Sequence, residues 1–227
     1  MAKHGKKYTD IAKKAPKEAT TLQEAITFIK ANPAGKFDET AELGMRMGCD
    51  PKKSDQMVRG TVSLPHGTGK KIRIIVFAGG TAADQAREAG ADFVGTDDLI
   101  EKIKGGWLDF DVAIATPDTM TEVRKLARQL GPRGLMPNPK TGTISDDTAS
   151  AVKAQKAGKV EFRMDRQGNI CVPFGKLSFA ADKLLENAET VLAAIRAERP
   201  SSTKGQYIRK CCVSSTMGVP VKIAIKE

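Results

Sequence analysis

The chain has 227 residues, a formal net charge of +10 and an isoelectric point of about 9.5. That length suits one or two domains, and the positive charge favours an anionic partner, with nucleic acid ahead of a membrane surface. No apolar run approaches the roughly 18 residues of a membrane span, and the basic N-terminus lacks the apolar stretch of a secretory signal. We therefore expect a cytoplasmic protein with no membrane segment.

The first third of the chain predicts a helix followed by two strands. Thr21 and Glu24 form a capping box for a helix over residues 21–31, whose apolar positions share one face. Residues 40–47 alternate between apolar and polar, which indicates a strand with one solvated face. Residues 56–65 are expected to be its partner strand.

The middle of the chain alternates short apolar runs with helical patterns. The apolar runs cover residues 72–78, 91–95 and 109–116, and the helical patterns cover residues 81–90, 96–106, 116–130 and 145–158. In the third helix, Thr116 is the expected N-cap and Pro117 the first helical residue. Such alternation predicts crossover connections and a parallel sheet with helices packed on it.

The last third returns to the pattern of the first. Residues 159–165 and 170–175 predict a β-hairpin, residues 184–195 a long amphipathic helix, and residues 207–213 and 221–225 two strands. We therefore expect an α/β protein with a discontinuous α+β outer domain, residues 1–66 and 159–227. An α/β domain with a parallel sheet, residues 67–158, is inserted into it.

Positive charge gathers on the outer domain. Residues 1–66 hold 12 Lys and Arg against 8 Asp and Glu, and residues 159–227 hold 12 against 7. Residues 67–158 hold 13 against 12 and are nearly neutral. We therefore expect the outer domain to make most of the contact with any nucleic acid.

The cysteines and histidines favour neither a metal site nor histidine catalysis. The four cysteines are Cys49, Cys171, Cys211 and Cys212, and the two histidines are His4 and His66. No CxxC pair is present, and the adjacent Cys211 and Cys212 would point to opposite faces of a strand, so they cannot bind one zinc ion together. We expect free thiols in a reducing cytosol, no metal and no cofactor.

Two glycine-rich stretches look like nucleotide-binding motifs but lack their defining parts. In HGTGKK, residues 66–71, Lys71 stands where a phosphate loop needs Ser or Thr, and a strand follows instead of a helix. The stretch FAGGTAAD, residues 77–84, lacks the GxGxxG pattern, which favours a tight turn. The acidic pairs Asp97–Asp98, Asp109–Asp111 and Asp146–Asp147 lie at or near helix or strand starts, where structural roles are expected.

Two further loops have unusual composition. In residues 126–142 three prolines hold the chain extended and Arg133 and Lys140 are displayed, which indicates a stiff loop or a packed connection. Residues 214–220, SSTMGVP, place small hydroxyl-bearing side chains between two strands. On these residues alone, the second loop is an ordinary strand end.

Both loops and four other stretches resemble motifs of one protein family and occur in the same order along the chain as in that family. LARQLGPRGLMPNPKTG, KFDET, RGTVSLPHGTGK, DFDVAIATPD, EFRMD and STMG are similar to motifs of the first-numbered ribosomal protein of the large subunit, the uL1 family, over residues 8–225. One difference is Val219, which precedes Pro220 where many members have proline directly after the glycine. The resemblance implies a split β-α-β outer domain of RNA-recognition type and a Rossmann-like inserted domain.

The resemblance also implies partners and binding residues. It implies a protein that binds large-subunit rRNA at the mobile stalk, aids release of deacylated tRNA from the exit site and represses translation of its own operon mRNA, as a monomer within the ribosome. The RNA-binding residues that it implies are Lys36, Phe37, Thr40, Glu42, Arg163, Thr216, Met217 and Gly218. We add Ser214, whose hydroxyl can donate to and accept from RNA 2′-hydroxyls.

A nucleotide-using α/β enzyme built on residues 67–158 is the alternative class. The absence of a phosphate loop and of the GxGxxG pattern, together with the scarcity of histidine, weighs against it. We expect no enzymatic activity.

Overall fold

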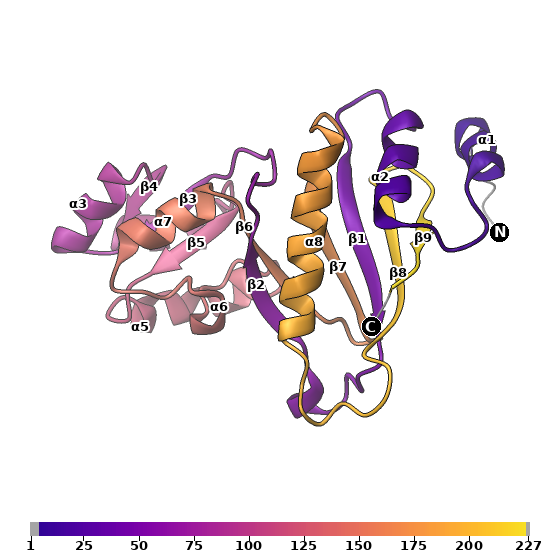
Figure 1. The fold of residues 1–227 in the computed structure, drawn as a ribbon. Coiled ribbons are helices and arrows are strands. Elements are labelled where there is room, and N and C mark those ends of the chain that lie inside the picture. The colour runs from indigo at the N-terminus through magenta and orange to yellow at the C-terminus, as the bar shows by residue number, and fades with distance from the viewer. Residues whose placement is uncertain (1–4, 226–227) are drawn as a thin grey trace. The chain divides into compact units, whose positions relative to one another are not determined.

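The computed structural model describes residues 5–225 and divides into two compact units (Figure 1). One unit comprises Met1–Gly69 and Val160–Glu227, and the other comprises Lys70–Lys159. Each unit buries apolar clusters of its own. The expectation about His4 falls outside the described residues.

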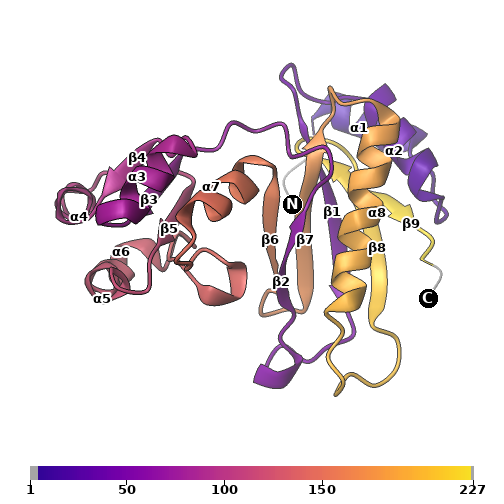
Figure 2. The ribbon, with the colours of Figure 1, turned by 60° about the vertical axis from the view of Figure 1, so that its left-hand side comes forward.

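The first unit contains a four-stranded antiparallel sheet with two helices on one face (Figure 2). The strand order is β7 (Asn169–Lys176), β1 (Thr40–Met47), β8 (Ile208–Ser215) and β9 (Val221–Ile223). The helices are α2 (Leu22–Ala31) and α8 (Ala181–Ala197), which share a core with the sheet. In β1 the side chains of Ala41, Leu43, Met45 and Met47 are buried, which confirms the alternation predicted for residues 40–47.

Local signals at the start of this unit behave as the sequence predicts. The Glu24 amide donates to Thr21 Oγ1 at 3.3 Å, and the Thr21 amide donates to Glu24 Oε2 at 3.0 Å, so the capping box of α2 is confirmed.

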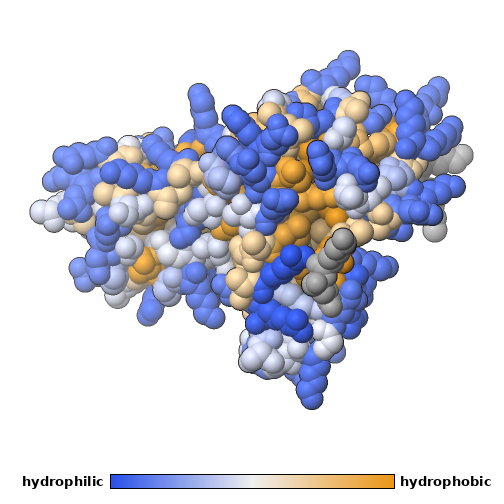
Figure 3. Space-filling view, in the orientation of Figure 1, coloured by the Kyte–Doolittle hydropathy of each residue, from blue (hydrophilic) through white to orange (hydrophobic). Residues whose placement is uncertain are grey.

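Between α2 and α8 the surface shows an apolar strip surrounded by hydrophilic side chains (Figure 3). Partly buried Leu22, Phe28 and Leu192 from these helices pack against the same core.

Two strand pairings differ from the prediction. β2 (Arg59–Ser63) pairs with β6 (Lys159–Arg163) in a separate two-stranded sheet, and not with β1, because β7 and β8 occupy both edges of β1. The predicted hairpin of residues 159–165 and 170–175 is also wrong, since β6 and β7 lie in different sheets.

Hydrogen bonds around Asp165 explain how the chain leaves one sheet and enters the other. The Met164 amide donates to Val58 O at 2.9 Å, which keeps the end of β6 beside β2. The next residue, Asp165, accepts from the amides of Gln167 and Asn169 at 2.8 and 2.7 Å, which turns the chain into β7. The turn was predicted correctly, but the strands on its two sides were assigned to one ladder instead of two.

The second unit is a parallel sheet covered by helices on both faces, as predicted. Its strand order is β4 (Phe93–Gly95), β3 (Ile74–Phe77) and β5 (Val112–Ala115). On one face α3 (Gly80–Glu88) and α7 (Thr148–Lys156) pack against Ile74 and Val76. On the other, α4 (Asp97–Lys104), α5 (Met120–Val123) and α6 (Ala127–Leu130) pack against Ile75 and Phe77.

The helix predicted over residues 116–130 is interrupted. A 3₁₀ turn, η2 (Arg124–Leu126), separates α5 from α6. Val123, Leu126 and Leu130 are all buried in the same core, so the predicted apolar face is kept across the interruption. The predicted N-cap Thr116 and first helical residue Pro117 are wrong, because α5 begins at Met120 and its N-cap is Thr119.

Helix α7 begins later than the Ser145 start that the sequence predicted. Asp147 is its N-cap and accepts from the Ser150 amide at 3.0 Å. Three elements had no prediction, namely α1 (Lys6–Lys14), η1 (Ser54–Gln56) and η3 (Pro139–Thr141). None of the helices described between residues 5 and 225 is long and apolar enough to cross a membrane.

Candidate RNA-binding site

Eight of the nine predicted site residues lie where two segments of the first unit, residues 36–42 and 214–218, meet. They are Lys36 and Phe37 before β1, Thr40 and Glu42 in β1, Ser214 in β8, and Thr216, Met217 and Gly218 in the turn after β8. In the antiparallel register Glu42 lies opposite Ser214. The Thr40 amide donates to Thr216 Oγ1 at 3.0 Å, and the Thr216 amide donates to Thr40 O at 3.1 Å. The start of β1 and the turn after β8 are therefore joined directly.

A buried carboxylate that the sequence analysis missed joins the same two segments. Glu39 has no exposed surface. The Gly35 amide donates to its Oε1, and the Met217 amide donates to its Oε2 at 3.1 Å. Burial alone would raise the pKa of Glu39, but hydrogen bonds from the Ser215 hydroxyl and from backbone amides outweigh it and hold the pKa below its ordinary value of 4.5. Glu39 thus remains a charged acceptor shared by two loops.

These two loops carry large apolar side chains that stay exposed. Phe37 and Met217 each keep 57% of their surface accessible. Exposed apolar side chains of this size cost hydration free energy, and a partner that covers them would recover it. Because Glu39 binds the backbone beside each of them, both side chains are held out from a fixed framework.

A second set of bonds ties the loop before β1 to the end of β7. Ser178 donates from its amide and its hydroxyl to the Asp38 carboxylate at 3.1 and 2.8 Å. The Lys176 ammonium donates to Asp38 O at 3.2 Å and to Thr40 Oγ1 at 3.0 Å. The loop is therefore fixed from both neighbouring strands.

Gly218 is required by the turn itself. A Cβ atom at this position would lie 2.2 Å from Ser215 Oγ, the hydroxyl that also bonds to Glu39. The Gly218 amide donates to Ser215 O at 3.0 Å, which closes the turn. The resemblance implies that Gly218 contacts RNA, and the structure shows a second reason for a glycine at this position.

The predicted residues Glu42 and Arg163 have distinct surroundings. Cys171 on β7 donates its thiol to Glu42 Oε2 at 3.4 Å, and burial together with this carboxylate raises the pKa of Cys171 to about 11. Arg163 is not brought together with the other eight, because it ends β6 in the separate sheet. It lies beside Asp165, which bonds to the start of β7, whereas Thr40 pairs with the end of β7 at Lys176.

Two of the other sequence candidates have structural explanations. Gly67 and Gly69 have left-handed φ values of 65° and 72°, and the next regular element is strand β3, not the helix of a phosphate loop. Asp111 accepts from the Lys70 ammonium at 2.6 Å. Within residues 5–225 no three His, Cys, Asp or Glu side chains are grouped as metal ligands, and all four cysteines are free.

Comparison with known proteins places the chain in a family. Residues 28–219 match the model of the Ribosomal protein L1p/L10e family. The chain belongs to this family. It is 54% identical, over 224 residues, to a protein of Mycobacteroides abscessus named large ribosomal subunit protein uL1, in an alignment that covers 98% of this chain and 95% of the relative.

Family membership decides between the two classes of function left open by the sequence. The chain is a ribosomal protein, a non-enzymatic and RNA-binding component of the cytoplasmic ribosome. The resemblance to the uL1 family is confirmed, and the nucleotide-using enzyme is excluded.

Proposed function

We propose that the chain is a structural protein of the large ribosomal subunit whose first unit binds large-subunit rRNA at the mobile stalk. The binding residues are the eight that surround Glu39. The observation that carries this proposal is the pair of loops fixed by one buried carboxylate, each presenting a large exposed apolar side chain, Phe37 or Met217.

The chemistry of this surface suits folded RNA. Folded RNA is recognised mainly through its shape, its 2′-hydroxyls and its phosphates. The hydroxyl of Ser214 and the carboxylate of Glu42 face each other across the strands and can bond to 2′-hydroxyls, while exposed Lys36 can pair with a phosphate. Phe37 and Met217 offer apolar contact to ribose faces. Because the loops are fixed in advance, binding costs little ordering entropy.

We further propose that the protein represses translation of its own operon mRNA and aids release of deacylated tRNA from the exit site, acting as a monomer within the ribosome. Recognition by shape needs only an equivalent fold, so one surface serves both rRNA and an mRNA that folds alike. The second unit carries almost no net charge and a separate core, which leaves it free of the primary rRNA contact.

A matched pair of methionine variants tests the rRNA proposal. Met217→Asp places a negative charge beside phosphate, whereas Met57→Asp changes the other large methionine exposed in this unit, at 43%. We expect Met217→Asp to weaken binding of purified large-subunit rRNA by at least about tenfold, equivalent to about 1.4 kcal/mol, and Met57→Asp to leave it unchanged. Both variants should melt like the wild type. Wild-type affinity in a folded Met217→Asp protein would overturn the assignment.

A further inference from the structure

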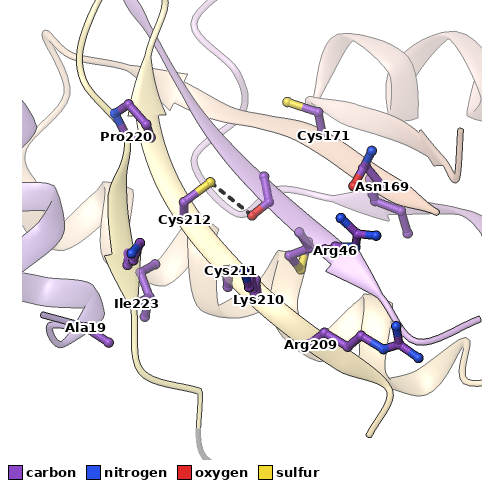
Figure 4. Close-up of a pocket in the computed structure, with 14 residues that line it drawn as sticks. Ala19, Arg46, Asn169, Cys171, Arg209, Lys210, Cys211, Cys212, Pro220 and Ile223 are labelled. Atoms are coloured by element: carbon purple, nitrogen blue, oxygen red, sulfur yellow. Dashed lines mark hydrogen bonds between the residues drawn. The ribbon is translucent and has the colours of Figure 1, made fainter. Parts of the chain in front are cut away.

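The face of the four-stranded sheet away from α2 and α8 carries a hollow of about 620 Å³ that the proposed function does not use (Figure 4). Its floor centres on Gly44 of β1. This residue lies between Cys171 of β7 and Cys212 of β8 in the strand register, and Figure 4 shows the two thiols on either side of β1. A Cβ at Gly44 would come within 3.1 Å of Cys212 Sγ, so the absence of a side chain keeps the floor low.

The rim of the hollow is basic. Arg46 on β1 lies opposite Lys210 on β8, and Lys222 on β9 lies opposite Cys212. The register of β1 and β8 shifts between Arg46 and Met47, which makes Arg209 the extra residue of a β-bulge. The bulge leaves two consecutive basic side chains, Arg209 and Lys210, exposed where a regular strand would turn one inward.

Among the described residues, no Asp or Glu lines the hollow, although the Glu42 carboxylate accepts a hydrogen bond from the Cys171 thiol at its edge. None of the ion pairs found in the described part of the chain involves the four basic residues of the rim, Arg46, Arg209, Lys210 and Lys222. Four such cations around a largely apolar floor suit an anionic partner that also has a flat apolar part.

The hollow is continuous with the site around Glu39. Thr40, Glu42, Gly44 and Arg46 alternate with the buried residues of β1 and therefore share this face. Four residues separate Glu42 from Arg46, a distance of about 13 Å along the strand. A strand of RNA that contacts Glu42 and Ser214 can reach the hollow without leaving the sheet.

We propose that the hollow binds an unpaired nucleotide of the same RNA, with its base over Gly44 and the neighbouring phosphates on the basic rim. This inference rests on the proposed function. The hollow has no aromatic lining residue on which a base could stack, so we expect little preference among the four bases.

The thiols of the chain report on this hollow. Cys171, Cys211 and Cys212 line it, but only Cys171 and Cys212 have accessible thiol-bearing side chains, because Cys211 is buried. Cys49 is buried and does not line the hollow. The full chain is treated with N-ethylmaleimide at mildly alkaline pH, with and without saturating purified large-subunit rRNA, and alkylation is read by mass spectrometry. We expect the RNA to slow alkylation of Cys171 and Cys212 severalfold.

A pair of lysine variants adds an independent measurement. Lys210→Ala removes a rim cation, and its control Lys183→Ala removes an exposed lysine from α8, which packs on the other face of the sheet. We expect Lys210→Ala to lower the slope of log affinity against log salt by about one and to reduce thiol protection. We expect Lys183→Ala to change neither.

The outcomes separate this inference from the proposed function. If the protein binds the rRNA with wild-type affinity while Cys171 and Cys212 stay unprotected, nucleotide binding in the hollow is overturned. The proposal for the Glu39 site is then unaffected. An equal slope of log affinity against log salt in Lys210→Ala and Lys183→Ala also overturns nucleotide binding in the hollow and leaves the Glu39 site unaffected. Protection by free nucleoside monophosphate but not by rRNA would assign the hollow to a small ligand and also overturn it. Absence of rRNA binding would overturn the proposed function and the inference together.

Discussion

Glu39 joins two parts of the chain that are far apart in sequence by hydrogen bonds. It accepts from the Met217 amide, 178 residues away, and from Gly35 within its own loop. A carboxylate buried without such donors would be protonated or would destabilise the fold. Here the donors compensate for burial, so Glu39 adds a charged link between the two loops to the direct bonds between Thr40 and Thr216.

Replacing this residue with its amide tests that role. In Glu39→Gln one oxygen becomes an NH₂ group, which would face an amide donor from Gly35 or Met217. We expect a loss of about 1–3 kcal/mol in the free energy of unfolding, the usual cost of a buried donor left without an acceptor, and weaker rRNA binding. Urea unfolding measures the first quantity. The control is Glu189→Gln on exposed α8 surface, and equal stability of the two variants would contradict the role.

The lowered pKa of Glu39 also predicts a pH dependence. Because the pKa is lower in the folded than in the unfolded protein, the stabilisation is fully present above the ordinary value of 4.5 and is lost as pH falls through the folded value. The wild type should therefore lose stability more steeply than Glu39→Gln below about pH 4.5. Urea unfolding from neutral to acidic pH gives the free energy of unfolding of both proteins. The other carboxylates contribute equally to both, so their contributions cancel in the difference between the two curves. Parallel curves would show that Glu39 is not charged in the fold.

The site residues could be predicted only in part. Seven of the eight that lie together came from the resemblance, because their motifs are contiguous in sequence, and Ser214 was added for the chemistry of its hydroxyl. Glu39 and Lys176 act through hydrogen bonds between segments far apart in the chain. Glu39 lies in a loop, where no periodic pattern of apolar residues predicts that a charged side chain is buried. The basic rim was missed for a related reason, since Arg209 and Lys210 face the same side only because of the bulge.

At the scale of elements, sequence predicts local structure better than pairing. The capping box of α2 and the alternation of β1 depend on neighbours within four residues, and both are confirmed. The choice of β7 and β8 as partners of β1 depends on which strands compete for its two edges, and no local pattern records that competition. The strand β2 was therefore assigned to the wrong sheet.

The turn after β8 offers a test at this scale. In Gly218→Ala the new Cβ would collide with Ser215 Oγ, so the turn must shift and the bond from Ser215 to Glu39 must weaken. We expect a loss of about 1–3 kcal/mol in stability, typical of overpacking, and weaker rRNA binding. The control is Gly79→Ala, where a Cβ meets nothing within 4 Å. Unchanged melting and rRNA affinity in Gly218→Ala would show that the turn accommodates the methyl group.

At the scale of the whole molecule, the two cores predict that the units fold independently. All buried members of the first core lie within residues 25–64 and 162–223. We expect that replacing Lys70–Lys159 with a short glycine-rich linker leaves a protein that unfolds cooperatively and binds rRNA with nearly full affinity. Calorimetry and rRNA titration at matched salt are the measurements. A folded deletion that has lost most of its affinity would place direct rRNA contact in the second unit, with Arg133 and Lys140 the first candidates.

The insertion of one unit into the other has a consequence for synthesis of the chain. Strand β1 leaves the translating ribosome early, but its two partners, β7 and β8, emerge only after the whole second unit. At about 5–20 residues per second, β1 waits on the order of ten seconds for β8, while the second unit can already fold. The two halves of the proposed RNA surface, residues 36–42 and 214–218, therefore meet only when nearly the entire chain has been made. We expect a nascent or truncated protein to leave the RNA site open to the finished protein.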